Sequence, residues 1–193
     1  MIIGSHDSWT FLRPKRWWMR LFAFTARCQQ LNIYDQYAAG ARCFDLRVKF
    51  TNGVLKIAHG LIDYEVSETE VMGDLYYLNM HPDTYVRVIH EIRSYTDCSI
   101  NEVRMFASWC AKIKDWFPNI YFFGGNNLLS KPNIDYDFKT RNLQIDGKYG
   151  SASGSLLYTL WPWLYAKLHN KENIIKGTSK DVLMIDFISD EDK

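Results

Sequence analysis

The order of residue patterns along the chain constrains its fold more than any other feature. Short runs rich in β-branched and aromatic residues alternate with longer amphipathic stretches that carry helix-capping signals. Such alternation is typical of α/β proteins with a largely parallel sheet. The runs that predict strands span residues 1–5, 41–50, 54–59, 84–93, 119–123, 142–146 and 181–189.

The amphipathic stretches predict three helices, and two of them begin with a capping box, a Ser followed three residues later by a Glu. The two boxes are Ser67 with Glu70 and Ser99 with Glu102, and the helices span residues 67–81, 99–117 and 154–170, the last interrupted at Pro162. Residues 13–30 form a further segment of helical length that is basic and aromatic.

The chain length limits the architecture. A closed (β/α) barrel usually takes about 250 residues, whereas this chain has 193. We therefore expect one domain over residues 1–193, folded as a compact, irregular TIM-like (β/α) barrel.

Charged side chains inside the predicted strands are informative, because buried strands normally carry apolar residues on both faces. Residues two apart on a strand share a face, so Asp45 lies with Arg47. By the same count, Glu91 lies with Arg93. One such pair is compatible with a purely structural ion pair. Four strands with a titratable residue near the carboxyl end indicate a site, because α/β folds bind ligands there.

The residue types at these strand ends suit phosphoryl transfer. Neutral imidazole can take a proton from an attacking hydroxyl, and imidazolium can return one to the leaving oxygen. Guanidinium offers paired donors to phosphoryl oxygens, and a carboxylate on the far nitrogen of a histidine fixes its tautomer. The candidates are His6, His59, Arg47, Arg93, Asp7, Asp45 and Asp186.

Charge and cysteine usage exclude several other classes. A formal net charge of +1 argues against a duplex-DNA binder. The four cysteines show no CxxC pair and no zinc spacing, which predicts buried free thiols in a reducing compartment. Neither a signal peptide nor an apolar run of about 20 residues is visible. We therefore expect a cytoplasmic protein.

Four separate motifs resemble the catalytic X domain of the bacterial-type phosphatidylinositol-specific phospholipases C. "GSHDSWTF" resembles the opening signature "GTHDS.TF", and "DQYAAGARCFDLR" resembles "Q...GAR.FDIR". "IAHG" resembles the "HHG" or "FHG" that follows, and "VLMIDF" is similar to the final strand "V.QDY". The order and spacing agree from the first residues to about residue 187.

The resemblance implies an acid–base pair of two imidazoles. By position, His6 would be the general base toward a hydroxyl vicinal to the phosphodiester, oriented by Asp186. His59 would be the general acid toward the leaving oxygen, with Asp7 near it. Arg47 would hold the phosphoryl oxygens.

The resemblance also implies substrate contacts and no metal. Asp45 lies beside Arg47, and Arg93 stands where the bacterial enzymes have lysine. "QIDGKY" is similar to the family's "VQDKY", which assigns Asp146 and Tyr149 to the headgroup. Positions that are acidic in the calcium-dependent branch hold Arg47 and Arg93 here, and calcium needs six to eight oxygen ligands. We therefore expect no metal and no cofactor.

The basic aromatic segment has two interpretations. Trp17 and Trp18, flanked by arginines and lysine, resemble an interfacial lipid anchor, because Trp favours the headgroup boundary and cations favour anionic lipid. Alternatively, the two indoles pack on the barrel. The first interpretation predicts peripheral contact with membranes.

The predicted activity is metal-independent cleavage of a phosphatidylinositol-type diester, giving a cyclic phosphate and diacylglycerol. "NIYFFGGNN" offers glycine where the bacterial pattern has an arginine that binds inositol hydroxyls. A first alternative is therefore the same chemistry on a nucleotide or RNA-like diester. A second is a non-catalytic module that binds a phosphorylated headgroup, although such a module has no need of both histidines and Asp186.

Overall fold

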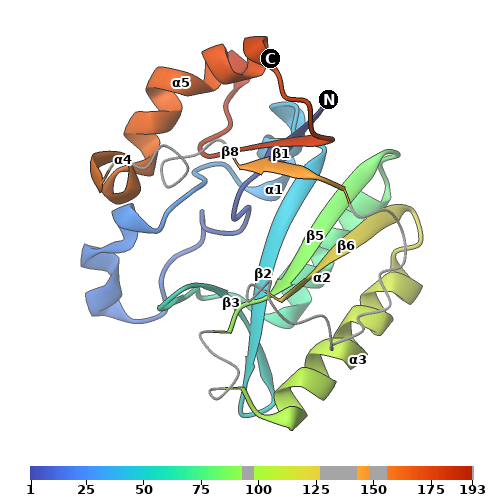
Figure 1. The fold of residues 1–193 in the computed structure, drawn as a ribbon. Helices are drawn as coiled ribbons and strands as arrows, with labels where there is room; N and C mark the ends of the chain where they lie inside the picture. The colour runs from blue at the N-terminus through green and yellow to red at the C-terminus, as the bar shows by residue number, and fades with distance from the viewer. Residues whose placement is uncertain (93–97, 127–142, 148–155, 193) are drawn as a thin grey trace.

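A curled, mostly parallel sheet forms the centre of the computed structural model, which describes residues 1–92, 98–126, 143–147 and 156–192 (Figure 1). The parallel strands are β1 (Ile2–Ser5), β2 (Cys43–Thr51), β5 (Thr84–His90), β6 (Ile120–Asn126), β7 (Ile145–Gly147) and β8 (Val182–Ile185). They pair in the order β6-β5-β2-β1-β8-β7. The α/β class and the half-barrel form of a TIM-like sheet are thereby confirmed, with β6 and β7 at the ends of the described sheet.

A hairpin extends one edge of this sheet. β3 (Val54–His59) runs antiparallel to the end of β2, and β4 (Ile62–Asp63) pairs with β3. The turn between β2 and β3 uses Asn52 and Gly53, both with positive φ. Because β2 is long, it pairs along one edge with β1 near its start and with β3 near its end. This arrangement brings the end of β3 toward the end of β1.

The helices pack around the sheet (Figure 1). They are α1 (Ile33–Ala38), α2 (Glu68–Asn79), α3 (Ile100–Trp116), α4 (Leu156–Leu160) and α5 (Pro162–Lys176). Both predicted capping boxes are present at the starts of α2 and α3. As predicted, the helical stretch near the end of the chain is divided at Pro162, which begins α5.

The main core lies between β2, β5 and the two capped helices. The apolar face of β2 and the matching residues of β5 are completely buried, as are the facing residues of α2 and α3. The central members are Phe44, Leu46, Val48, Val86, Val88, Val71, Leu75, Leu78, Phe106 and Ile113. Since these side chains take one face of β2, its other face is left for Asp45 and Arg47.

The structure corrects the prediction for residues 13–30. This segment contains only two short 3₁₀ helices, η1 (Trp17–Leu21) and η2 (Ala23–Thr25). Neither has a side-chain cap, and none of their residues is buried. Without a cap or a buried face, a regular α-helix has little to stabilise it there.

Other differences concern element ends and short elements. The predicted strands 84–93 and 181–189 end earlier, at His90 and Ile185. After Ile185 the chain turns at Phe187, whose φ is 48°. The sequence also gave no expectation of α1 or of the two-residue β4, which are too short to show a clear periodicity.

Candidate active site

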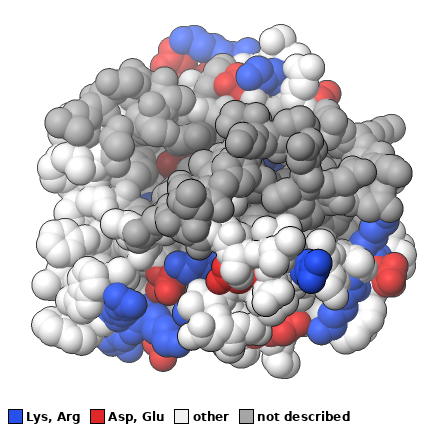
Figure 2. Space-filling model, turned by 60° about the horizontal axis from the view of Figure 1, so that its bottom comes forward, with Lys and Arg blue, Asp and Glu red and all other residues white. Residues whose placement is uncertain are grey.

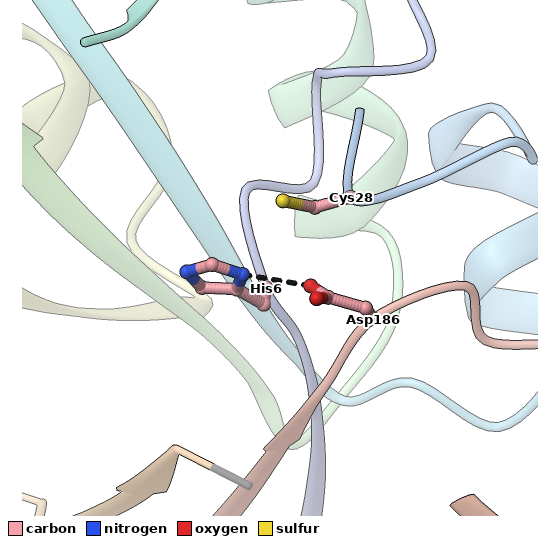
Figure 3. A group of neighbouring side chains, drawn as sticks. All are labelled: His6, Cys28 and Asp186. Atoms are coloured by element: carbon pink, nitrogen blue, oxygen red, sulfur yellow. Dashed lines mark hydrogen bonds and ion pairs between the residues drawn. The ribbon is translucent and has the colours of Figure 1, made fainter. Parts of the chain in front are cut away.

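Two neighbouring parallel strands end together and place a histidine beside a carboxylate. β1 and β8 are in register at Ser5 and Ile185, and the backbone N–H of His6 donates to the carbonyl of Ile185 at 2.9 Å. The following residues, His6 and Asp186, therefore leave the sheet side by side. Nδ1 of His6 lies 2.7 Å from Oδ1 of Asp186. The dashed line in Figure 3 marks this contact. Both side chains are buried.

Asp7 turns the chain away from β1 and aims its carboxylate into the same space. Its φ of 44° lies in the left-handed region, which non-glycine residues seldom adopt. Ser8 holds this turn against β2, because its N–H donates to the carbonyl of Asp45 at 3.0 Å and its Oγ accepts from the N–H of Asp45 at 2.8 Å. Strain maintained in this way is typical of functional sites.

Arg47 lies at the centre of the polar cluster. Its guanidinium pairs with both Asp7 and Asp45, the Nη2–Oδ2 separation to Asp45 being 3.0 Å. The same Nη2 lies 2.9 Å from Nε2 of His6. Burial opposes the charge, but Asp7 and Asp45 outweigh it and keep the pKa of Arg47 above its ordinary value. The guanidinium is therefore a fixed positive charge beside the His6 ring.

The second histidine faces the first across this charge. Nε2 of His59 lies 3.2 Å from Oδ2 of Asp7, and Nδ1 lies 2.9 Å from the carbonyl oxygen of Ala26. Because a carbonyl only accepts, we assign the Nδ1 hydrogen to this contact. The centroids of the His6 and His59 rings are 6.3 Å apart. A phosphate group is of the size that such a separation accommodates.

The electrostatic surroundings support proton transfer through His6. Burial disfavours its charged form, but the carboxylates of Asp7 and Asp186 outweigh burial and raise the pKa of His6. For Asp45, burial is likewise outweighed, here by Arg47 and Arg87, and the pKa of Asp45 is lowered. The cluster thus combines a stably ionised carboxylate with an imidazole that titrates above its ordinary range.

Sequence reasoning did not assign a role to Arg87 or Glu91, which border the cluster. Nη1 of Arg87 lies 3.5 Å from Asp45, and Oε2 of Glu91 lies 3.7 Å from Nη1 of Arg47. The Glu91 carboxylate also accepts from the N–H of Gly60, directly after His59, at 3.2 Å. Counting residues in steps of two back from Glu91 to Arg87 would have placed both side chains on one face of the predicted strand 84–93.

Apart from Asp45, the predicted substrate contacts lie outside the described residues or on another strand. Arg93 and Tyr149 lie outside the described residues. Asp146 lies on β7, where its carboxylate accepts 2.6 Å from Oγ1 of Thr178, a residue that precedes β8. The roles of these three residues stay predictions, whereas Asp45 is part of the cluster.

An apolar groove of about 410 Å³ adjoins His59. It is lined by residues of η1 and η2 and of the β3–β4 turn, namely Trp18, Met19, Phe22, Thr25, Ala26, His59, Gly60, Leu61 and Ile62. Trp17 is 72% exposed and Trp18 is 44% exposed. Such exposure favours the interfacial interpretation of these two indoles over packing on the barrel.

Oxygen ligands for a hard cation are present but already paired. Asp7 and Asp45 both bind the guanidinium of Arg47, so they offer too few unpaired oxygens for the six to eight ligands that calcium needs. Several His, Cys and carboxylate atoms do approach one another closely, among them those of Cys28, drawn in Figure 3. The expectation that the reaction needs no metal stays a prediction.

The surface charges and the helices relate to the expectations for partners, which stay predictions. On the part of the face in Figure 2 where side chains are described, basic and acidic residues are interspersed and form no continuous basic stripe. Duplex nucleic acid binds best to such a stripe. Of the helices in the described ranges, none is both long and apolar enough to cross a bilayer.

Comparison with known proteins gives a fold but no family. No protein-family model matches the sequence, and no curated protein does so. The phosphatidylinositol-specific phospholipase C of Listeria monocytogenes matches structurally over 99% of this chain and 89% of its own, with a TM-score of 0.65 and 16% identity. This chain has the phospholipase C fold. A variant of the Staphylococcus aureus enzyme matches over 96% of this chain and 84% of its own, with a TM-score of 0.66 and 16% identity.

A second Staphylococcus aureus phospholipase C structure, which concerns the modulation of membrane binding, agrees over 96% of this chain and 85% of its own. Its TM-score is 0.62 and its identity 15%. The phospholipase C fold accounts for the position of the polar cluster, because barrels of this class place their sites at the carboxyl ends of the strands. His6 and Asp186 directly follow the ends of β1 and β8, and Asp45 and Arg47 lie on β2 just beyond the residue that pairs with Ser5.

Proposed function

We propose that the protein is a phosphodiesterase of the phospholipase C type, which cleaves a diester by attack of a hydroxyl vicinal to the phosphate. The observation that carries the proposal is the pair of imidazoles, 6.3 Å apart, with Arg47 and Asp7 between them. A binding module needs the guanidinium but has no use for two opposed imidazoles. The phospholipase C fold supports the same conclusion.

In the first half of the reaction, His6 acts as general base. Nε2 of neutral His6 takes the hydroxyl proton while the hydroxyl oxygen bonds to phosphorus. Asp186 holds the Nδ1–H and stabilises the imidazolium that forms. Arg47, which contacts Nε2 of His6 in the free protein, turns its donors to the phosphoryl oxygens.

In the second half, His59 acts as general acid. The bond from phosphorus to the leaving oxygen breaks, and Nε2 of protonated His59 gives that oxygen its proton. Asp7 lies 3.2 Å from this nitrogen and can accept the hydrogen that it carries before transfer. The products are a cyclic phosphodiester and a free alcohol, and the proton from His6 returns to solvent.

The surroundings of His59 support a lipid as the leaving group. The apolar groove adjoins His59, the proposed acid. We therefore infer that the groove binds the departing alcohol. We therefore propose phosphatidylinositol as the substrate, with cyclic inositol phosphate and diacylglycerol as products. A nucleotide diester offers a polar leaving group and would leave the groove empty.

Phosphorus NMR of phosphatidylinositol turnover with EDTA present tests substrate, product and metal independence together. We expect a cyclic phosphate resonance, and loss of nearly all turnover in His6→Ala and His59→Ala, each folded by circular dichroism. Tight headgroup binding without turnover would favour the binding module instead. Turnover only of an oligonucleotide would indicate a nucleic-acid substrate. Full activity of either alanine variant would exclude the two-imidazole mechanism.

We also propose that Trp17 and Trp18 contact the lipid interface. Trp17→Ala and Trp18→Ala are each expected to weaken binding to phosphatidylinositol-containing vesicles several-fold, because each removes an exposed indole. Co-sedimentation measures the binding. Trp116→Ala is the matched control, since Trp116 is 59% exposed but lies at the end of α3. Equal losses in all three variants would argue against a dedicated interface.

A further inference from the structure

Cys28 is a polar side chain at the site for which the proposed reaction has no use. The residue is only 3% exposed, and its backbone is fixed on both sides. Its N–H donates to Oγ1 of Thr10 at 2.9 Å, and its carbonyl accepts from the N–H of Phe187 at 2.6 Å. The thiol therefore has a set position relative to β1 and β8, and Figure 3 shows it beside the His6–Asp186 pair.

The thiol, His59 and Asp7 converge on one point. Sγ of Cys28 lies 3.8 Å from Oδ2 of Asp7, and Nε2 of His59 lies 3.2 Å from the same oxygen. All three atoms are within 4.8 Å of one another. Zinc bound tetrahedrally at its usual bond lengths separates N from O by about 3.3 Å and S from O by about 3.5 Å. The observed separations differ from these by a few tenths of an ångström.

The hydrogen bonds of His59 indicate which kind of ligand can bind between its Nε2 and the Asp7 carboxylate. Nδ1 uses its hydrogen on the carbonyl of Ala26, so in the neutral ring Nε2 presents a lone pair to the Asp7 carboxylate. Two acceptors 3.2 Å apart need a positive centre between them. In the proposed reaction that centre is a proton, and a soft divalent cation would satisfy the same two atoms.

The other oxygen of Asp7 does not compete for this cation. Oδ1 pairs with Nε of Arg47, while Oδ2 faces His59 and Cys28. The carboxylate can thus bridge the guanidinium on one side and a cation on the other. Thiolate, imidazole and carboxylate together are a ligand set that zinc accepts and calcium does not.

We propose that Cys28, His59 and Asp7 form a zinc site. Bound zinc prevents His59 from acting as the proposed general acid. Zn²⁺ bonds to Sγ, Nε2 and Oδ2, the thiol proton passes to solvent, and water fills the fourth position. The bound ion takes the lone pair on which the acid proton would otherwise sit. Zinc binding itself does not depend on the proposed function, whereas inhibition by zinc does.

The binding test uses metal-free protein and Co²⁺ or Zn²⁺ alone. We expect one ion per chain and a thiolate-to-cobalt charge-transfer band. Cys28→Ser should abolish the band and weaken zinc binding by at least about 100-fold, since loss of even an outer partner commonly costs 10- to 100-fold. Cys98→Ser, which alters a thiol elsewhere on the chain, should change neither.

X-ray absorption of the zinc-loaded Cys98→Ser protein supplies a readout that needs no change at Cys28. One sulfur at about 2.3 Å with nitrogen and oxygen ligands at about 2.0 Å is expected. A zinc shell without sulfur, or a cobalt band that survives in folded Cys28→Ser, would overturn the site. If zinc binds as described but no variant or parent turns over any diester, the site stands and the proposed function fails.

Discussion

Asp186 determines which nitrogen of His6 can accept a proton. A buried carboxylate 2.7 Å from Nδ1 holds the hydrogen on that atom and leaves Nε2 as the acceptor. Against the opposing effect of burial, Asp7 and Asp186 together raise the pKa of His6. Removing the Asp186 charge should therefore change both the tautomer and the pKa.

Asp186→Asn is expected to lower the pKa of His6 and to reduce kcat by about 10²- to 10⁴-fold. Because the base must be neutral, a lower pKa moves the acid limb of the kcat/KM profile to lower pH. NMR titration of the imidazole and the pH profile measure the two effects. Asp115→Asn, at an exposed position of α3, should change neither. An unaltered His6 titration in Asp186→Asn would contradict the assigned pairing.

Much of the candidate site was predictable at the scale of single residues, because strand side chains alternate between faces. That rule places Asp45 and Arg47 on one face of their strand from the sequence alone. Contacts made by loops have no such period. The Ala26 carbonyl that binds His59 and the position of Cys28 depend on how residues 13–30 fold, and the sequence indicated only a segment of helical length there.

Among the elements, β6 depends on one glycine for its pairing with β5. Gly124 has a φ of 133°, and a Cβ placed there would lie 2.0 Å from the carbonyl oxygen of Val88. The obstructing atom belongs to the neighbouring backbone and cannot rotate away. A side chain at this position must therefore separate the two strands.

Gly124→Ala is expected to destabilise the protein by about 2–5 kcal/mol, from overpacking and an unfavourable φ together. Urea unfolding followed by circular dichroism measures the loss. Gly73→Ala is the matched control, because Gly73 is inside α2 with no atom within 4 Å of the added Cβ. That change should stabilise the helix by up to about 1 kcal/mol. Similar effects of both substitutions would rule out the backbone clash.

Elements with strong local signals were predicted well. α2 and α3 carry capping boxes and long amphipathic patterns, and both begin at the residue after the predicted cap. The ends of β5 and β8 were overestimated, since the apolar pattern continues beyond the last paired residue. The neighbouring strand determines where the pairing of a strand stops. The strand's own sequence does not contain that information.

The stability of the whole molecule should depend on pH through His90. Its ring is 1% exposed and stacks on Phe106 with centroids 4.5 Å apart. Burial, opposed only by Glu102, lowers the pKa of His90 to about 4. The folded state thus binds fewer protons than the unfolded state between the ordinary value of 6.5 and about 4. The stabilisation is present above that window and is lost as the pH falls through it.

His90→Phe, which keeps an aromatic ring against Phe106, is expected to reduce this dependence. Between pH 7 and pH 5 the variant should lose about 2 kcal/mol less unfolding free energy than the parent. Urea titrations at both pH values give the comparison. His6, whose pKa is raised, contributes with the opposite sign in both proteins and cancels in the difference. Equal pH dependence of parent and variant would show that His90 is not the responsible group.

The topology brings together two residues of the proposed reaction that are far apart along the sequence. His6 and Asp186 are 180 residues apart, yet they meet because β1 pairs with β8. During synthesis on the ribosome, the proposed base therefore leaves the exit tunnel 180 residues before its carboxylate. In a nascent chain that has not yet reached Asp186, the pair that would orient the proposed base cannot form.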